Sequence, residues 1–201
     1  MLDSLFGEMT LTAIISTCSL LAVWVPFYRG FRLFLEGRAA TRVLTADELK
    51  RGVRDGTNAR VDPVALVMVR TLARALRENQ AGHPREFLVD ATKQYVVNEY
   101  DANYARRISM YSNILPPIGF IGTTGGLLIL FFSMHSSNES LELGALALAL
   151  TSSIFALMGF ATLEGLKIGN YGRLLRAVDG AVQATRLREE KAQPVAAAAA
   201  S

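Results

Sequence analysis

The sequence contains one cysteine, Cys18, in 201 residues, so no intrachain disulfide and no cysteine-based metal cluster is possible. Charged residues are missing from three long stretches, which lie between Glu8 and Arg29, between Arg107 and Glu139, and between Glu142 and Glu164. Each stretch has room for the roughly 20 residues that cross about 30 Å of hydrocarbon at about 1.5 Å per residue. Three such stretches in so short a chain favour three transmembrane helices over the buried helices of a soluble core.

Other features are absent as well. We find no nucleophile paired with a base, so we expect no enzymatic activity. We also expect no cofactor and no metal site. No basic run is interleaved with aromatic residues, so the pI near 9.2 does not indicate binding to nucleic acid. The first ten residues, "MLDSLFGEMT", have no basic residue ahead of the apolar stretch. We therefore expect the first span to remain as an anchor instead of being cleaved as a signal peptide.

The 21 Lys and Arg residues have a clear distribution. All of them lie between Arg29 and Arg107 or from Lys167 onward. Cytoplasmic loops of membrane proteins carry an excess of Lys and Arg, so both regions are predicted to be cytoplasmic. The N-terminus and the loop between the second and third spans are then outside, and the C-terminus is inside.

The predicted fold is all-α, with three transmembrane helices, two of them extending far into the cytoplasm, and a small helical cytoplasmic insert. In chain order we predict an outer N-terminus (1–8), a first span (9–28), the cytoplasmic insert with the start of a long helix (29–107), a second span (108–134), an outer loop (135–142), a third span (143–164), a cytoplasmic helix extension (165–190) and a disordered tail (191–201).

Local signals mark helices within the insert. Thr45 and Glu48 have capping-box spacing. Asp62 is expected to be the N-cap of a helix with Pro63 in its first turn. The apolar face of that helix is predicted to be Leu66, Val69, Leu72 and Leu76. A long helix is predicted to begin near Pro84 and to run without a breaker as far as Pro116.

The stretch "PPIGFIGTTGG", from Pro116 to Gly126, is unusual inside an apolar run. It lacks the Lys-Ser/Thr ending of a phosphate-binding loop, and no strand precedes it. Gly122 and Gly126 form a GxxxG pattern, which is typical of a close contact with another helix. Gly119, Thr123 and Gly126 share a helix face, and a kink at Pro116 and Pro117 would free backbone carbonyls beside it. Such a face could also line a narrow polar path through a helix bundle.

The third span has a similar composition. A ridge of small residues runs along one face and suits close packing: Ala145, Ala149, Ser152, Ala156, Gly159 and Thr162. Thr151 lies beside this ridge, about 100° around the helix from Ser152. Taken alone, a membrane threonine usually bonds a carbonyl of its own helix or a neighbouring helix, so a purely structural role for Thr123 and Thr151 stays open.

Two of these stretches resemble a known family. "SNILPPIGFIGTTGG" is similar to the second-helix motif APxxGLxGTVxG of the MotA/TolQ/ExbB proton-channel family, with matches at Pro116, Gly119, Gly122 and Thr123. "ALALALTSSIFALMGF" resembles the third-helix motif AEALxATAxGLxxAIP, and Thr151 falls on its threonine. Three spans with an outer N-terminus fit the TolQ/ExbB branch.

The resemblance implies a function. Members of this family form a homo-oligomeric ring, a pentamer in characterised branches, around single helices of a partner of the ExbD/TolR/MotB type in the bacterial inner membrane. An Asp of the partner carries the proton, and the faces with Thr123 and Thr151 line its path. The chain would then be the stator of a motor driven by the proton-motive force, in contact with membrane lipid.

The sequence departs from the family at two places. Leu146 stands where the TolQ/ExbB branch has a glutamate, and the proline of the third-helix motif is missing. Glu164 and His135 are further candidate proton relays, although Glu164 is expected to snorkel or to pair with Lys167, and His135 to be solvated in the outer loop. The alternative function is a non-conducting scaffold that recruits partners. A transporter fits poorly, because the spans contain no charged site and no inverted repeat.

Overall fold

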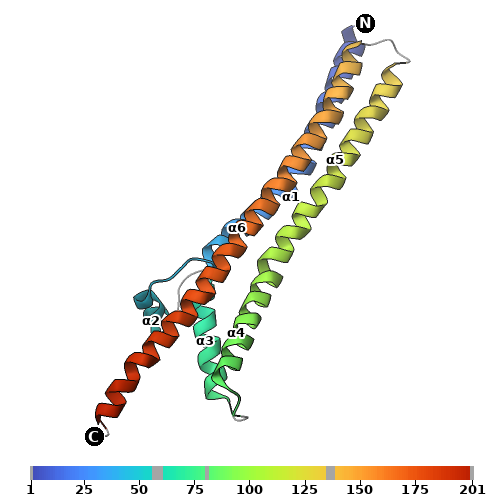
Figure 1. Cartoon of the computed structure of the whole chain (residues 1–201). Helices are drawn as coiled ribbons and strands as arrows, with labels where there is room; N and C mark the ends of the chain where they lie inside the picture. The colour runs from blue at the N-terminus through green and yellow to red at the C-terminus, as the bar shows by residue number, and fades with distance from the viewer. Residues whose placement is uncertain (1, 56–60, 80–81, 135–138, 200–201) are drawn as a thin grey trace. The chain divides into compact units, whose positions relative to one another are not determined.

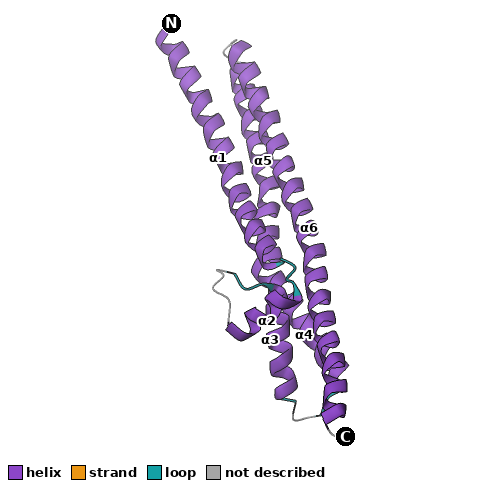
Figure 2. Ribbon diagram, turned by 90° about the vertical axis from the view of Figure 1, so that its left-hand side faces the viewer, coloured by secondary structure: helices purple, strands orange, loops and turns teal. Residues whose placement is uncertain are grey.

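The computed structural model describes the backbone of residues 2–55, 61–79, 82–134 and 139–199, and the side chains of 17–45, 47–54, 61–79, 82–134 and 142–186. Over these residues the chain is helical and contains no strand (Figure 2). The elements are α1 (Leu2–Ala40), α2 (Ala46–Asp55), α3 (Val64–Arg77), α4 (Arg85–Tyr100), the π-helical segment η1 (Asp101–Ala105), α5 (Arg106–Ser133) and α6 (Glu139–Ala199) (Figure 1).

Among the residues that the structure describes, three helical stretches are long and apolar enough to cross a membrane: Thr17–Ala40, Arg85–Ser133 and Glu142–Arg186. The predicted all-α class with three candidate spans is therefore confirmed. The sidedness of the chain, the outer segments and the cytoplasmic insert stay predictions, and His135 lies outside the described residues.

The second of these stretches combines α4, η1 and α5 into one continuous helical run. It begins at Arg85, one residue after Pro84, as predicted. The π-helical segment was not predicted, and such single turns occur within longer α-helices. Pro116 and Pro117 lie inside α5, which continues past them to Ser133. Because neither proline has an N–H, the carbonyls of Ser112 and Asn113 lose their usual intrahelical donor.

The chain divides into two compact units. Unit 1 consists of residues 1–33 and 107–166, and unit 2 of residues 34–106 and 167–201. In unit 1, parts of α1, α5 and α6 pack side by side (Figures 1 and 2). A Cβ added at Gly30 of α1 would lie 2.8 Å from Leu163 Cδ1 of α6 and 3.4 Å from Tyr111 Cβ of α5. These three residues therefore bring the three helices together at one level.

The core of unit 2 is built around α3 and α4. Its buried apolar side chains come mainly from α3, α4 and the segment of α6 in this unit, with single residues from α1, α2 and η1, and include Met68, Leu72, Val96, Leu174 and Val178. Asn170 Nδ2 donates to Phe34 O at 3.1 Å, which ties this segment of α6 to the end of α1. On the predicted apolar face of α3, Leu66 and Leu72 are buried, whereas Leu76 is 38% exposed because α3 ends one residue later.

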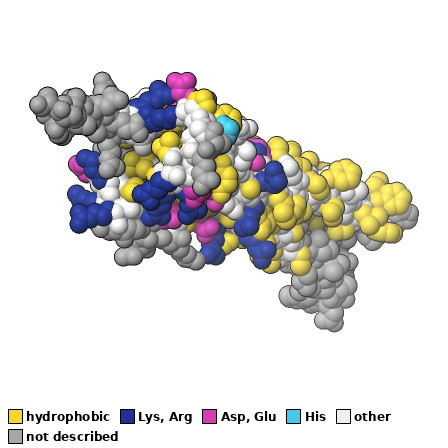
Figure 3. Space-filling view, turned by 90° about the horizontal axis from the view of Figure 1, so that it is seen from below, with side chains coloured by type: hydrophobic (Ala, Val, Ile, Leu, Met, Phe, Trp, Pro, Cys, Tyr) yellow, Lys and Arg dark blue, Asp and Glu magenta, His cyan; other side chains and the backbone are white. Residues whose placement is uncertain are grey.

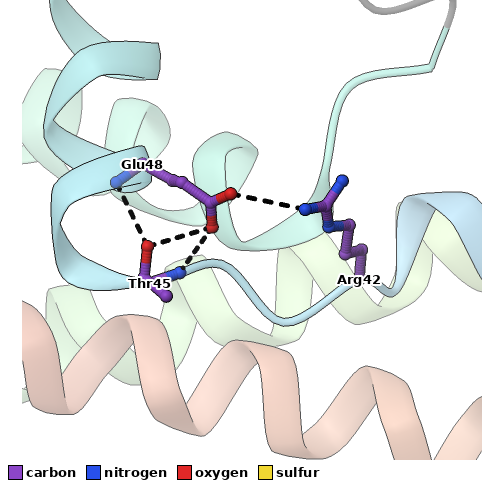
Figure 4. A network of polar contacts seen from close by, with 3 residues as sticks. All are labelled: Arg42, Thr45 and Glu48. Carbon is purple, nitrogen blue, oxygen red and sulfur yellow. Dashed lines mark hydrogen bonds and ion pairs between the residues drawn. The ribbon is translucent and has the colours of Figure 1, made fainter.

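The start of α2 has the predicted capping box (Figure 4). The backbone N–H of Thr45 donates to Glu48 Oε2 at 2.9 Å, and the N–H of Glu48 donates back to Thr45 Oγ1 at 3.4 Å. Arg42 adds an exposed ion pair to Glu48 at 3.3 Å. The predicted N-cap of α3 is wrong by one residue: Pro63 is the cap, and Asp62 lies within 3.5 Å of the Arg70 guanidinium instead.

The end of α6 also differs from the prediction. A disordered tail was expected from Lys191 because this segment has no apolar face to bury. The α6 backbone instead runs to Ala199. Alanine has the highest intrinsic helix propensity, and the tail contains five consecutive alanines that favour helix without a packing partner.

The surface is divided by chemistry. Figure 3 shows Lys and Arg side chains gathered over one part of the viewed face and hydrophobic side chains over another. In unit 1 large apolar side chains of α5 and α6 are exposed, such as Phe120, Ile121, Phe132, Leu143 and Met158. Soluble monomers rarely expose large contiguous apolar patches, and exposed apolar side chains on these candidate spans suit contact with lipid or with other helices.

Candidate proton pathway between α5 and α6

Three glycines of α5 allow α6 to approach closely. A Cβ added at Gly119 would lie 2.7 Å from Ala156 Cβ, and one at Gly126 would lie 2.7 Å from Ala149 Cβ. Gly122 faces Ser152 in the same way. Carbon atoms at optimal separation are about 3.5–4.0 Å apart, so no side chain larger than hydrogen fits at these positions without movement. We call this contact the α5–α6 seam.

The opposing ridge on α6 is buried for most of its length. Ala145, Ala149, Ser152 and Ala156 are nearly inaccessible to solvent. Gly159 is buried as well and faces Leu115 of α5 and Phe27 of α1. Thr162 lies at the exposed end of the ridge. The short side chains thus serve the packing of α5 on α6.

Thr123 lies at the seam and is half-buried. Its Oγ1 is 3.0 Å from the carbonyl oxygen of Gly119, in its own helix, and 3.2 Å from that of Ala149, in α6. It also hydrogen-bonds the hydroxyl of Ser153, which in turn lies 3.2 Å from Gly119 O. Two hydroxyls and two carbonyls therefore form a compact polar cluster between two apolar helices.

Sequence reasoning did not identify Ser153. It follows Ser152 directly, and the pattern of small residues singled out Ser152 as part of the ridge. Ser152 hydrogen-bonds within its own helix, with Oγ 3.1 Å from Ala149 O. The available signal was the run of hydroxyls in "TSS", which guarantees that hydroxyls cover a wide arc of α6.

Thr151 does not take part in this cluster. It is exposed, and its hydroxyl donates to the carbonyl of Ala147 at 2.6 Å. Thr124 and Thr162 are exposed and bond their own helices in the same way. Among the described side chains, Thr123 is thus paired with Ser153, while Thr151, which falls on the threonine of the third-helix motif, is exposed.

A second polar contact between α5 and α6 lies farther along the helices. Ser112 is fully buried, and its Oγ is 2.6 Å from Glu164 Oε1.

The structure also places the other residues that the sequence singled out. Leu146, at the position of the family glutamate, is 41% exposed. Pro116 is half-buried and Pro117 exposed, one turn from Ser112.

An apolar groove of about 510 Å³ lies between α6 and α1. Its walls include Trp24 and Phe27 of α1 and Phe155 and Met158 of α6. Among its described lining residues, Thr162 is the one with a hydroxyl group, which donates to Met158 O at 2.7 Å. The groove therefore offers apolar contact alone.

Among the described residues, no group of three or more His, Cys, Asp or Glu side chains is placed to hold a metal ion. Comparison of the chain with models of known protein families gives no match, and comparison with curated proteins gives no significant match.

Proposed function

We propose that the chain is the membrane subunit of a proton-driven motor, similar to the MotA/TolQ/ExbB family. In this proposal several copies, five as in characterised branches, form a ring in the bacterial inner membrane with the N-terminus outside. The ring encloses a single-span partner whose Asp carries the proton, and the parts of the chain rich in Lys and Arg lie in the cytoplasm.

The observation that carries this proposal is the polar cluster of Thr123 and Ser153 between apolar, candidate membrane-spanning helices. A carboxyl group in the membrane is costly unless polar groups lie beside it. The hydroxyls at the seam can donate to a carboxylate and accept from a carboxylic acid, so they suit both protonation states of a passing acid. Thr151, which is exposed on the protomer, would face such an acid or the adjacent copy.

The proton-motive force would supply enough energy to move the partner. One proton that moves through 100 mV releases about 2.3 kcal/mol, which can bias a rotation or rocking step of the partner. The closely packed glycine seam would keep the ring subunit rigid while the partner moves.

The test uses the chain reconstituted in proteoliposomes with its single-span partner. Thr123→Val and Thr151→Val remove one hydroxyl each and nearly keep the side-chain shape. We expect each to lower proton-driven output at least about tenfold, since positioned proton-transfer groups contribute about 10²–10⁴. Thr124→Val and Thr162→Val are the matched controls, because these hydroxyls are exposed and bond their own helices. Undiminished output from both test variants would contradict the proposal.

A non-conducting scaffold is the second candidate function. It is favoured by the fact that Thr123, Thr151 and Ser152 each reach a carbonyl within the protomer, as purely structural hydroxyls would. A scaffold would keep its partners in Thr123→Val and would conduct no protons in any form. Co-purification of partners together with a flux measurement on the same preparations distinguishes the two functions.

A further inference from the structure

The contact between Ser112 and Glu164 has no role in the function proposed above. Both residues belong to unit 1. Ser112 is fully buried and Glu164 is half-buried. A carboxylate in such a position needs hydrogen bonds to offset the cost of leaving water. The 2.6 Å contact with Ser112 Oγ supplies one of them.

The Ser112 hydroxyl has two acceptors within reach. One is Glu164 Oε1, and the other is the carbonyl oxygen of Ser109 at 3.1 Å. A hydroxyl carries one hydrogen, so it donates to only one of them at a time. When Glu164 is ionised, Ser112 donates to its carboxylate. When Glu164 is protonated, the acid donates to Ser112 Oγ, and Ser112 donates to Ser109 O.

Both protonation states of Glu164 are therefore satisfied without movement of a heavy atom. Pro116 adds a further hydrogen-bond acceptor near the Glu164 carboxyl group. Pro116 has no N–H, so the carbonyl of Ser112 lacks its usual intrahelical donor and keeps a spare acceptor site for water or for the acid. The Ser112 carbonyl thus offers an acceptor to Glu164 when its carboxyl group is protonated.

The contact also lies on the same seam as the Thr123 cluster. Ser112 and Thr123 are eleven residues apart on α5, as are Ser153 and Glu164 on α6. Eleven residues correspond to about three turns, so each pair shares a helix face to within about 20° and is separated by about 16 Å. Such a distance is too long for a direct proton transfer between the two positions.

We propose that Glu164 is a proton-binding residue of the α5–α6 seam, held against Ser112, at the end of the seam that the charge pattern assigns to the cytoplasm. The step is a simple protonation: the carboxylate takes a proton and becomes a carboxylic acid. Its role as the inner terminus of the path rests on the proposed function, whereas its proton binding does not. The charged or titratable residues near this level of the three helices are Tyr28, Arg29 and Arg32 on α1, Arg107 and Tyr111 on α5, and Lys167, three residues farther along α6.

Infrared difference spectroscopy tests the proton binding directly. The full chain in lipid nanodiscs is recorded while the pH is lowered, and the carbonyl band of protonated carboxylic acids is followed. We expect Glu164→Gln to remove one component of this band and Ser112→Ala to shift that component to higher frequency, because the acid loses a hydrogen-bond partner. Glu142→Gln, in the first turn of the same helix, is the matched control and should keep the component.

The amide of Gln keeps an oxygen that accepts from Ser112, so Glu164→Gln should fold, as checked by its circular dichroism. An unchanged band in Glu164→Gln would overturn the proposal. In the reconstituted complex, the same variant should lower proton-driven output at least about tenfold. Full output would overturn the role in the path. The infrared result needs no partner and no flux, so it stands apart from the outcome of the Thr123 and Thr151 variants.

Discussion

The close approach of α6 to Gly126 gives a prediction about stability. In Gly126→Ala, the added methyl carbon would lie 2.7 Å from Ala149 Cβ and 2.8 Å from both Ala145 O and Ala149 N. The optimal carbon–carbon separation is about 3.5–4.0 Å, so the new contact is short by about 1 Å. Two of the three atoms belong to the backbone of α6 and cannot rotate away. The helices must therefore separate locally.

The cost follows from this separation. A gap of about 0.5–1 Å forfeits a quarter to a half of the dispersion energy of each contact along the seam. Overpacking of this kind typically costs about 1–3 kcal/mol. Replacing glycine by alanine in a helix recovers about 1 kcal/mol. We therefore expect Gly126→Ala to destabilise unit 1 by about 0–2 kcal/mol in net terms.

Gly125→Ala is a control that separates the cost of the clash from the gain in helix propensity. Gly125 is the adjacent residue in the same helix, and a Cβ added there meets no atom within 4 Å. It gains the same helix propensity without the clash, so it should be neutral or up to about 1 kcal/mol more stable than the parent. The difference between the two variants isolates the clash and should be about 1–3 kcal/mol.

The assay is unfolding of the purified chain in mixed micelles with increasing SDS, followed by circular dichroism. Gly126→Ala should unfold at a lower SDS fraction than Gly125→Ala. Separation by about 1 Å would also take the 3.2 Å contact from Thr123 to Ala149 O beyond hydrogen-bonding distance. If the two alanine variants unfold together, the glycine seam does not hold α5 against α6 and the geometry argued above is wrong.

Two further predictions concern unit 2. Leu66→Ala should lower the free energy of unfolding by about 2–5 kcal/mol, because Leu66 is fully buried. Leu76 is 38% exposed, so Leu76→Ala should change the free energy of unfolding by less than about 1 kcal/mol in the same denaturation assay. Thr45→Ala should cost about 1 kcal/mol through loss of the cap of α2. Hydrogen bonds from the backbone N–H and the hydroxyl of Thr45 hold the pKa of Glu48 below its ordinary 4.5. The Glu48 carboxylate therefore stabilises α2 above pH 4.5, and this contribution is lost as the pH falls through the lowered pKa. Amide NMR signals of α2 should follow that loss in the parent and not in Glu48→Gln.

Much of the fold could be predicted because its signals are local. The absence of charge over three stretches is enough to identify three apolar helices. The spacing of Thr45 and Glu48 is enough to identify a capping box. The long helix that begins at Arg85 could be predicted because no breaker interrupts it. Each of these inferences depends on residues within one or two turns of each other.

The candidate site was harder to predict, because it depends on how two helices are rotated against each other. Helical spacing places Ser152 and Ser153 about 100° apart on α6, but it does not say which of them faces Thr123. That choice is made by Gly119, Gly122 and Gly126, whose missing side chains fix where α6 lies on α5. Glycine patterns in a single sequence indicate a close contact without identifying its partner.

The same geometry explains why hydroxyls occur where they do along the seam. A glycine face brings two backbones so close that carbonyls of one helix come within reach of side chains on the other, as Ala149 O does for Thr123. Only a short side chain with a rotatable hydrogen can use this space and still accept a proton from a third group. Close packing of the two helices and the presence of hydroxyl groups between them therefore have the same cause. A scaffold and a proton path with this seam would differ in whether a titratable group comes near these hydroxyls. Glu164 is such a group within unit 1, where its carboxyl oxygen lies 2.6 Å from Ser112 Oγ.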